Sequence, residues 1–398
     1  MSRLVFVNRF FYPDHSATSQ MLTDAAFYLS AKGHDVQVVT SRLLYEGSSD
    51  LAYKEVVQGV TVHRTWTSSF GRSNLIGRAF DYLTFYISVF WVLFRILEPG
   101  ITVVAKTDPP LVSIPVGAAA RIRGARHVNW LQDIFPEVAV ELGMKIPGFA
   151  VSILTWLRNR SLLQADQNIV IGELMRNRIL KQGVYTDNTT VVPNWADGTA
   201  VVPRTTKNPL REKWQLEGKF VVGYSGNLGR AHEIETLLGA IRQLSSDTSV
   251  VFLFIGGGAL LDELKTRLGE PGMSNCLFQP YQPREQLHLS LTLPDVHLVI
   301  LKPELEGLIV PSKIYGVMSA GKPMLYVGDK EGEVGSLVIE HGIGGVVAEG
   351  DSEALVSQIQ KMKESPAWLT EMGDASRRLF DEHYSREMSL AKLEAALC

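Results

Sequence analysis

Short runs of β-branched and aromatic residues alternate along this chain with longer stretches in which apolar residues recur every three or four positions. The short runs predict strands and the longer stretches predict amphipathic helices, so the alternation predicts parallel sheets joined by helical crossovers. In the first half, strands are expected at 4–8, 35–40, 61–65, 101–105, 127–131, 167–171 and 190–193. The helices expected between them include 19–32, which would end at Gly33, and 110–123.

The alternation stops over 197–219, a polar stretch that contains Pro203 and Pro209, and then begins again. Strands are expected at 220–224, 250–255, 276–279, 296–301, 324–327 and 345–347, and helices at 234–244, 260–268, 284–292 and 352–363. Two such series predict an α/β protein with two Rossmann-like doubly wound domains facing a cleft, at 1–200 and 201–382. In such sheets, ligands bind at the carboxyl ends of the strands.

Composition narrows the class of protein. A chain of 398 residues with 45% hydrophobic and 20% charged residues suits two globular domains. A formal net charge of −3 without a basic arm argues against nucleic-acid binding. Cys276 and Cys398 are the only cysteines, which argues against a disulfide framework and a cysteine-based zinc site. The first residues read as a strand and not as a signal peptide, so we expect a cytoplasmic protein.

One long apolar segment, 80–97, runs from Phe80 to Leu97 with Asp81 and Arg95 as its only formal charges. It is compatible with a core helix, with a helix lying in a membrane interface, and, by length alone, with a short membrane span. The interface alternative places aromatic rings at headgroup depth and arginines near anionic lipid, namely Tyr82, Tyr86, Trp91, Arg72, Arg78 and Arg95.

Two glycine-rich turns follow predicted strands of the second half. In the first, Gly226, Asn227 and Arg230 lie between a strand and a helix expected near Glu233. Glycine lets backbone N–H groups approach a phosphate, and an arginine could contact a diphosphate; an ordinary turn with a surface arginine is the alternative. The second turn, around Gly257, does not complete a dinucleotide fingerprint, which removes the main support for a dehydrogenase.

Charged residues also follow the strand expected at 296–301. Glu304 and Glu306 could accept hydrogen bonds from sugar or ribose hydroxyls, and Lys313, in the first turn of an apolar helix, could meet a phosphate. The alternative is a solvated loop in which Ser312 caps the helix.

The first half offers acceptor-binding candidates. Asp133 and Glu137 follow an apolar strand, and Gln132 precedes them; His15 and Ser16 follow the first strand. The sequence contains no D-x-D, H-E-x-x-H or G-x-S-x-G motif, and its histidines lack metal-ligand spacing. We therefore expect no metal and no cofactor, with cationic side chains and helix dipoles neutralising any leaving diphosphate.

Taken together, these motifs resemble glycosyltransferase family 4, the retaining enzymes of the two-domain glycosyltransferase-B fold, over nearly the whole chain. The landmarks are Tyr12-Pro13, KGHDV at 32–36, VPNWAD at 192–197, IGGG at 255–258, and the stretch from Glu306-Gly307 to Gly321-Lys322-Pro323. Within the family, YPDHSATSQ at 12–20 and PSKIYG at 311–316 resemble a bacterial O-antigen and capsule branch similar to N-acetyl-L-fucosamine transferases.

The resemblance implies a nucleotide-sugar donor in the second domain, with its base near Tyr281, and an acceptor on the first domain. It also implies that a C-terminal helix, within 383–398, crosses back to the first domain. The chain departs from the family pattern at several positions. The usual arginine and lysine of the phosphate turn are Asn227 and His232, the second glutamate of E-x7-E is absent, and the usual His-Asp pair is Gln132-Asp133.

From these observations we expect a retaining transfer from a nucleotide diphosphate sugar, UDP-linked, to a lipid-linked sugar at the inner face of the plasma membrane. Arg230 and Lys313 would stabilise the leaving diphosphate, Glu304 or Glu306 would orient the donor sugar, and Asp133 would position the acceptor. A nucleotide-sugar epimerase of the same fold and a non-catalytic scaffold subunit are the alternatives.

Overall fold

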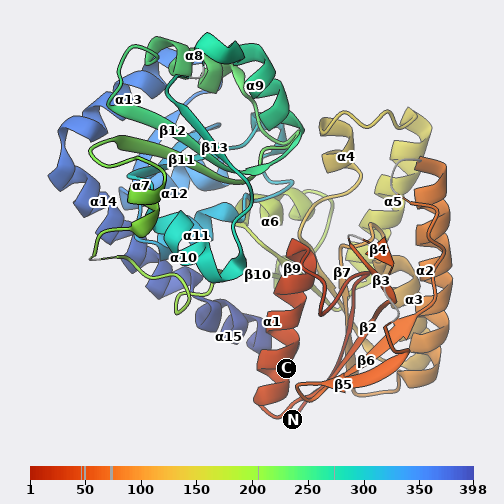
Figure 1. Ribbon diagram of the computed structural model, residues 1–398. Helices are drawn as coiled ribbons and strands as arrows, with labels where there is room; N and C mark the ends of the chain where they lie inside the picture. Colours follow the sequence, from red (N-terminus) through yellow and green to blue (C-terminus); the bar gives the residue numbers. More distant parts are fainter. Residues whose placement is uncertain (46, 49–50, 72–74, 205, 273) are drawn as a thin grey trace. The chain divides into compact units, whose positions relative to one another are not determined.

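The computed structural model describes residues 1–45, 47–48, 51–71, 75–204, 206–272 and 274–398. The chain divides into two compact units (Figure 1). Unit 1 comprises Met1–Val192 and Leu390–Cys398, and unit 2 comprises Pro193–Ser389. The division follows Val192, whereas the sequence placed it at residue 200, and only the last nine residues return to unit 1.

The strands of unit 1 are β1 (Arg3–Val7), β2 (Asp35–Ser41), β3 (Leu43–Leu44), β4 (Gly47–Ser48), β5 (Lys54–Val57), β6 (Val60–Thr65), β7 (Ile101–Lys106), β8 (Arg126–Trp130), β9 (Gln167–Val170) and β10 (Thr189–Val191). Its helices are α1 (Ala17–Ala31), α2 (Leu75–Ile96), α3 (Ser113–Arg123), α4 (Glu137–Glu141), α5 (Gly148–Gln164) and α6 (Glu173–Leu180). A 3-10 turn covers Thr186–Asn188.

The strands of unit 2 are β11 (Phe220–Asn227), β12 (Val250–Gly257), β13 (Cys276–Gln279), β14 (Val296–Ile300), β15 (Met324–Val327) and β16 (Gly344–Val347). Its helices are α7 (Pro209–Lys213), α8 (Glu235–Gln243), α9 (Ala259–Gly272), α10 (Leu287–Thr292), α11 (Lys313–Ser319), α12 (Glu333–His341), α13 (Ser352–Glu364) and α14 (Pro366–Leu379). Short 3-10 turns cover Arg284–Gln286 and Pro303–Leu305, and a π-helical turn covers Phe380–Tyr384. Helix α15 (Arg386–Leu397) begins in unit 2 and ends in unit 1.

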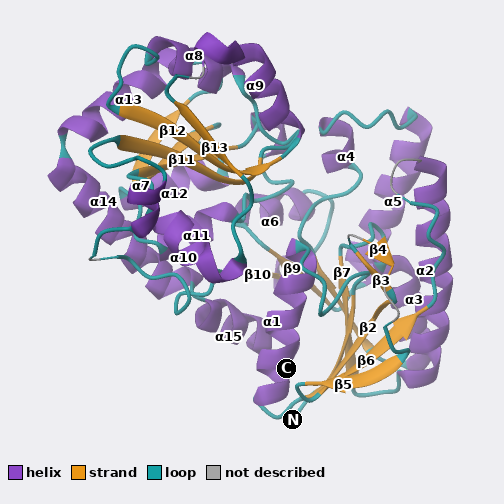
Figure 2. Cartoon of the chain, in the orientation of Figure 1, coloured by secondary structure: helices purple, strands orange, loops and turns teal. Residues whose placement is uncertain are grey.

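The sheet of unit 1 has the strand order β10-β9-β8-β7-β1-β2-β6-β5 (Figure 2). All of its neighbouring strands are parallel except β5 and β6, which form a hairpin. The hairpin turns at Gln58 and Gly59, both with positive φ. Strand β5 was not predicted from the sequence, because its polar residues interrupt the apolar run that would indicate a strand. The order in which strands are added reverses between β1 and β7, which are parallel, and this makes their carboxyl ends a topological switch point.

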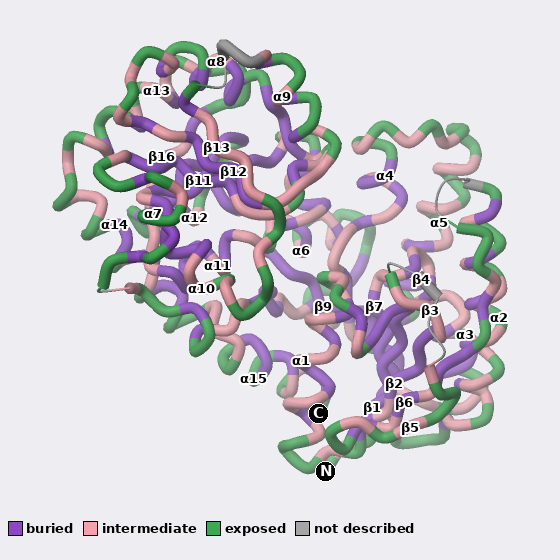
Figure 3. Tube along the Cα trace, viewed as in Figure 1, coloured by how far each residue is buried: buried purple, intermediate pink, exposed green. Residues whose placement is uncertain are grey.

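The sheet of unit 2 is wholly parallel, in the order β13-β12-β11-β14-β15-β16. This is the doubly wound arrangement, with its switch point between β11 and β14. The central strands are largely buried (Figure 3), as continuous apolar runs such as Val250–Gly257 require, whereas the residues of the edge strand β13 are half-buried.

Every strand that the sequence predicted is present, and boundaries account for most differences. Helix α8 begins at Glu235, one residue after the expected start at 234, and just before it the Glu233 carboxylate accepts a hydrogen bond from the Thr236 N–H at 3.0 Å. The helix expected at 284–292 is a 3-10 turn followed by the short α10. Helix α1 is followed by Gly33, whose φ of +89° suits glycine.

Helix α2 contains most of the long apolar segment and has two faces. Phe85, Val89 and Leu93 are fully buried in the core of unit 1, with Val5 and Val7 of β1. On the outer face, Phe80, Leu83, Ile87 and Trp91 are between 51% and 53% exposed. Among the described helices, Ile76–Ile96 is long and apolar enough to cross a membrane, but its packing on the sheet makes it a surface helix of unit 1.

Two aromatic residues of α2 do not lie where the interface alternative placed them. The Tyr82 ring lies against the Arg9 guanidinium, 5.1 Å from its centroid, and the Tyr86 hydroxyl donates to the Pro110 carbonyl. Both therefore turn toward the protein, because each has a polar partner there. Arg72 lies outside the described residues.

Candidate functional site

The two glycine-rich segments of unit 2 continue their strands instead of turning away. Parallel pairing of β11 and β12 extends to Gly226 opposite Gly256 and Asn227 opposite Gly257. Gly226 has φ +119° and Gly256 has φ +133°, and a Cβ on Gly256 would lie 2.3 Å from the Gly226 carbonyl oxygen. The close backbone approach therefore requires glycine, which leaves a bare surface at the carboxyl end of two strands.

Tyr281 lies beside this bare surface. Its ring is exposed, and its Cε2 would be 3.5 Å from a Cβ on Gly257. The residue follows β13, so three neighbouring strand ends contribute to one place.

Lys313, the first residue of α11, points its amine toward the end of β11. The amine donates a hydrogen bond to the Tyr224 hydroxyl and lies 3.4 Å from Nε2 of His232. It also lies 3.7 Å from the centroid of the Tyr224 ring. Within the described part of the chain, Lys313 forms no ion pair with a carboxylate, so its charge is available to an anionic ligand.

Tyr224 and His232 hold this amine through a network of their own. His232 donates from Nδ1 to the Gly229 carbonyl at 2.9 Å, which leaves Nε2 as an acceptor. The Tyr224 hydroxyl donates to the Asn227 carbonyl at 2.8 Å and therefore accepts from Lys313. Tyr224 and His232 thus each present an acceptor atom to the Lys313 amine, which is the donor in this network.

The electrostatic environment of this cluster matches that geometry. Burial, together with the nearby Lys313 charge, lowers the pKa of His232 to about 4, so the imidazole is neutral at pH 7. Burial lowers the pKa of Lys313 to about 7. An anion placed beside Lys313 would raise that pKa again and would itself be stabilised.

The other predicted donor residues lie around this cluster. Arg230 is exposed on the loop after β11 and has no hydrogen bond or ion pair among the described residues. Asn227 is exposed at the strand end. Ser312 occupies the N-cap position of α11, but its side chain makes no capping hydrogen bond, contrary to the solvated-cap alternative.

The two predicted glutamates differ from each other. Glu306 is half-buried; its carboxylate accepts hydrogen bonds from the Tyr326 hydroxyl and from the Glu333 N–H at 3.0 Å, at the start of α12. Burial raises the pKa of Glu306. Glu306 therefore supports the loop and α12 within the protein, whereas Glu304 is exposed in the preceding 3-10 turn.

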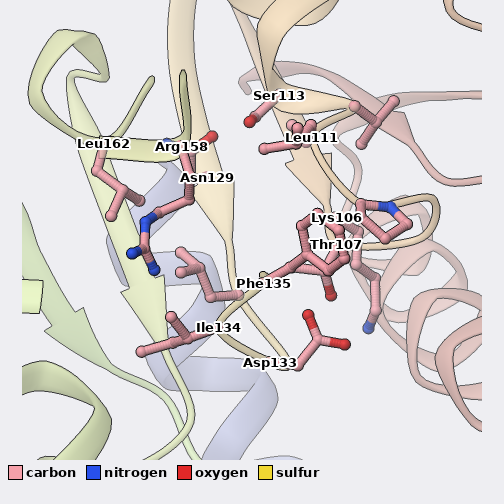
Figure 4. A pocket seen from close by; sticks show the side chains of 14 residues that line it. Lys106, Thr107, Leu111, Ser113, Asn129, Asp133, Ile134, Phe135, Arg158 and Leu162 are labelled. Carbon is pink, nitrogen blue, oxygen red and sulfur yellow. The ribbon is translucent and has the colours of Figure 1, made fainter. Parts of the chain in front are cut away.

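In unit 1, a small pocket of about 40 Å³ lies at the carboxyl ends of β7 and β8, with room for a few water molecules. Figure 4 shows the carboxylate of Asp133 pointing into this pocket, on the side where Lys106 and Thr107 lie. Burial raises the pKa of Asp133 to about 7, and the Asp108 charge adds to the shift. Its Oδ1 atom has no hydrogen-bond partner among the described residues.

Lys106, the last residue of β7, is almost fully buried in the wall of the same pocket. Its amine lies 3.7 Å from the centroid of the Trp130 ring and has no hydrogen-bond partner in the described parts of the chain. Burial lowers its pKa to about 7, against the opposing effect of Asp108 and Asp24. The buried Lys106 and the half-buried Asp133 are thus two ionisable groups that share one pocket.

The remaining acceptor candidates are spread around unit 1. Glu137 accepts a hydrogen bond from Arg158 at 2.5 Å, so its charge is already paired inside the protein. His15 is exposed, and Ser16 is the N-cap of α1 with its N–H donating to Asp14 at 2.8 Å. Gln132 is half-buried beside Asp133.

Three residues of these two clusters were not predicted from the sequence. Lys106 was hidden because a charged residue at the end of an apolar strand looks like a surface boundary. Tyr224 was taken as part of a buried strand. His232 was noted only as a departure from a family pattern, although a histidine where that pattern has a lysine was a usable signal. Within the described residues, no group of three His, Cys, Asp or Glu side chains could hold a metal ion.

Comparison with known families covers most of the chain. Residues 18–195 match the family model described as a glycosyl transferase 4-like domain. Residues 206–379 match the model described as glycosyl transferases group 1. Both clusters described above fall within these matches.

Individual proteins show the same likeness. The chain is 32% identical over 301 residues to a probable glycosyltransferase, WbjE, of Pseudomonas aeruginosa. This match covers 75% of this chain and 74% of WbjE. It is 26% identical over 384 residues to the putative colanic acid biosynthesis glycosyl transferase WcaI of Escherichia coli K12, covering 93% and 94%. Among solved structures, Anabaena HepE in complex with UDP-glucose has a TM-score of 0.73 at 16% identity, covering all of both chains.

Proposed function

Because this chain belongs to the glycosyltransferases of the family 4-like and group 1 type, with the glycosyltransferase-B fold, we propose that it transfers a sugar from a UDP-linked donor to a lipid-linked sugar during assembly of a bacterial cell-surface polysaccharide. The transfer proceeds with retention of configuration and without a metal ion. Two of the relatives support the pathway, since their names describe bacterial glycosyltransferases, one of them in colanic acid biosynthesis.

The observation that carries this proposal is the cation set at the strand ends of unit 2. Lys313 contacts the neutral Tyr224 and His232, and Arg230, two residues before His232, is exposed without an ion pair among the described residues. The bare backbone at Gly226 and Gly256 gives a diphosphate room to approach. Preorganised cations of this kind stabilise charge that develops on a leaving group.

In the proposed reaction, the bond between the anomeric carbon and the diphosphate oxygen breaks on the face where the acceptor hydroxyl attacks. The hydroxyl oxygen forms the new bond to the anomeric carbon, and its proton passes to the departing diphosphate. Lys313 and Arg230 stabilise the negative charge of that diphosphate. Asp133 hydrogen-bonds an acceptor hydroxyl and positions it, a role that suits a carboxylate directed into a pocket.

Thermal shift of the full chain against UDP, GDP, ADP and TDP, with and without EDTA, tests the donor class. A nucleotide at about 100 times its dissociation constant stabilises the fold by about 2.7 kcal/mol. We expect a shift with UDP that EDTA does not reduce and that Lys313→Gln makes smaller. A shift that depends on added metal, or none with any nucleotide, would contradict the proposal.

Donor turnover separates the transferase from an epimerase of the same fold. UDP release that requires an added saccharide acceptor is expected. Conversion of the donor sugar in the absence of any acceptor would identify the epimerase instead.

The lipid-linked acceptor implies work at a membrane surface, and we propose that α2 provides the contact. The row of half-exposed apolar side chains from Phe80 to Trp91 supports this, because such a stripe can enter the headgroup region of a bilayer. Leu83→Ser with Trp91→Ser should reduce binding to phospholipid vesicles. The matched control is Tyr53→Ser with Val56→Ser, which removes two exposed apolar side chains elsewhere in unit 1. Vesicle binding that is unchanged in the α2 variant would contradict a membrane contact through α2.

A further inference from the structure

Three helices of unit 1, α2, α3 and α5, have an unusual charge composition. Each contains two arginines and none contains a lysine, which gives six cations. Their single carboxylate is Asp81, which is buried and accepts hydrogen bonds from Ser68 and Phe70. Arg158 is paired with Glu137 of α4, but in a chain with a formal net charge of −3 the excess of arginine on these three helices is still a local concentration of positive charge.

Helix α5 also carries an exposed apolar row. Phe149, Ile153 and Trp156 recur at intervals of four and three residues and so lie on one helix face. Their exposed fractions are 73%, 54% and 58%. A second helix of unit 1 therefore presents aromatic side chains to its surroundings, in addition to α2.

A pocket of about 600 Å³ lies between α3 and α5, within the size range of ligand sites. Its walls include small and apolar residues such as Gly117 and Ala118. Trp156, Arg121 and Arg160 also line it. Neither of these arginines forms an ion pair with a carboxylate in the described ranges, and the Arg160 guanidinium lies 5.7 Å from the centroid of the Trp156 ring.

The buried side of the pocket offers an unpartnered polar atom. His127 is only 5% exposed, lines the pocket, and its Nε2 has no hydrogen-bond partner among the described residues. The ring lies against Gly117 of α3, where a Cβ would be 3.0 Å from His127 Cε1. Asp166, the one carboxylate in the lining, accepts a hydrogen bond from the backbone N–H of His127 at 2.8 Å.

We propose that this pocket binds the phosphate headgroup of an anionic membrane phospholipid. Arg121 and Arg160 pair with the phosphate, His127 hydrogen-bonds an oxygen of the headgroup, and Trp156 packs against the glycerol and the upper acyl chain. The apolar walls and the exposed row on α5 favour a lipid over a soluble phosphate, because a small anion would leave them in water. The inference rests on the proposed function only in that the enzyme works at a membrane.

Vesicle binding of the full chain tests the site. Wild type is compared with R121Q/R160Q on phosphatidylcholine vesicles with and without about one third phosphatidylglycerol. Because each arginine near an anionic leaflet strengthens binding about fivefold, the double variant is expected to bind the anionic vesicles about 25-fold more weakly. K207Q/K213Q, which removes two exposed cations from unit 2, is the matched control and should bind like wild type.

A second measurement distinguishes the lipid from a soluble anion. Calorimetric titration with monomeric dihexanoyl phosphatidylglycerol should show binding that R121Q/R160Q loses and that inorganic phosphate does not compete away. Equal affinity for inorganic phosphate would overturn the assignment to a lipid. Undiminished vesicle binding by R121Q/R160Q would overturn the site itself.

Turnover with a soluble acceptor in detergent keeps the two proposals separate. R121Q/R160Q should retain wild-type turnover there, since the pocket lies outside the residues assigned to transfer. Absent turnover in every protein would count against the proposed function and leave the lipid site standing, whereas normal turnover with unchanged vesicle binding would count against the lipid site alone.

Discussion

The amine of Lys313 lies 3.4 Å from Nε2 of His232, the residue that stands where the resemblance to family 4 leads us to expect a lysine. We propose that Lys313, on α11, supplies the positive charge that the loop after β11 would then lack. The compensation is spatial, since the two positions are 81 residues apart. A neutral histidine is compatible with it, because a second ammonium group there would repel the first.

The first prediction concerns moving the positive charge from position 313 to position 232. Lys313→Gln should lower kcat by about 10²-fold to 10³-fold, the usual effect of removing a preorganised stabilising group. His232→Lys in that background should recover at least part of the loss, because it returns one cation to the same place. Steady-state kinetics with the donor identified by thermal shift provide the measurement.

The single variant His232→Lys is the control for this exchange. It places two ammonium groups together and should lower the melting temperature without raising kcat. If K313Q/H232K were no more active than Lys313→Gln alone, spatial compensation would be refuted.

The second prediction concerns the alkaline side of the pH profile. The pKa of Lys313 is lowered to about 7 by burial, so the free enzyme loses this charge as the pH rises through 7. The value of kcat/KM for the donor should therefore fall above pH 7. Lys313→Arg should move this decline to much higher pH, since a guanidinium stays charged. A decline that remains in the arginine variant belongs to another group.

The third prediction concerns the acidic side of the profile. Asp133 has its pKa raised to about 7, so its carboxylate gains a proton as the pH falls through 7. If the charged form positions the acceptor, kcat/KM for the acceptor should fall below pH 7. The Asp133→Asn variant should be slow at all pH values and should not show this decline in acid. Donor binding, followed by thermal shift, should be the same in both proteins.

The fourth prediction concerns backbone geometry. Gly256→Ala would place a Cβ 2.3 Å from the Gly226 carbonyl oxygen at φ +133°, and should destabilise unit 2 by about 3 kcal/mol. Gly218→Ala, at φ +70° with no atom within 4 Å of the added Cβ, should cost only about 1 kcal/mol. Urea unfolding of both variants measures the difference, and equal costs would show that the strand ends can separate freely.

The fifth prediction concerns stability in acid. His232 and His297 are buried in unit 2 with the pKa of each lowered to about 4, so the folded state binds fewer protons than the unfolded state between pH 6.5 and pH 4. The free energy of unfolding should therefore decrease as the pH falls through that range. Glu306, whose pKa is raised by burial, acts in the opposite direction. His297→Asn should roughly halve the decrease in melting temperature, and an unchanged pH dependence would contradict the assignment.

Much of the fold could be predicted from local patterns, because strand and helix periodicity reports which face of each element is buried. The parallel strands of both sheets were found in this way, and the restart after the polar stretch at 197–219 indicated two domains. The antiparallel strand β5 was missed, since an edge strand with alternating polar residues has no continuous apolar run.

The residues of the candidate sites, like the fold, could be predicted from the sequence only in part. The sequence alone placed Gly226, Arg230, Lys313 and Asp133 at strand ends, because the carboxyl ends of parallel strands lie at one edge of a sheet. The sequence could not show that Glu306 accepts a hydrogen bond from Tyr326 and that Glu137 accepts one from Arg158. Each partner is about twenty residues away in the chain, so only the packing of the elements brings the two side chains together.

The sequence by itself determined the family, the doubly wound sheets and the chemical types of the residues around the candidate donor site. Tertiary structure decided which charges are left unpaired, because pairing depends on distances between residues remote in the chain. Lys313 meets His232 and Tyr224, Lys106 meets Trp130, and His127 meets Gly117 only after the strands and helices have packed.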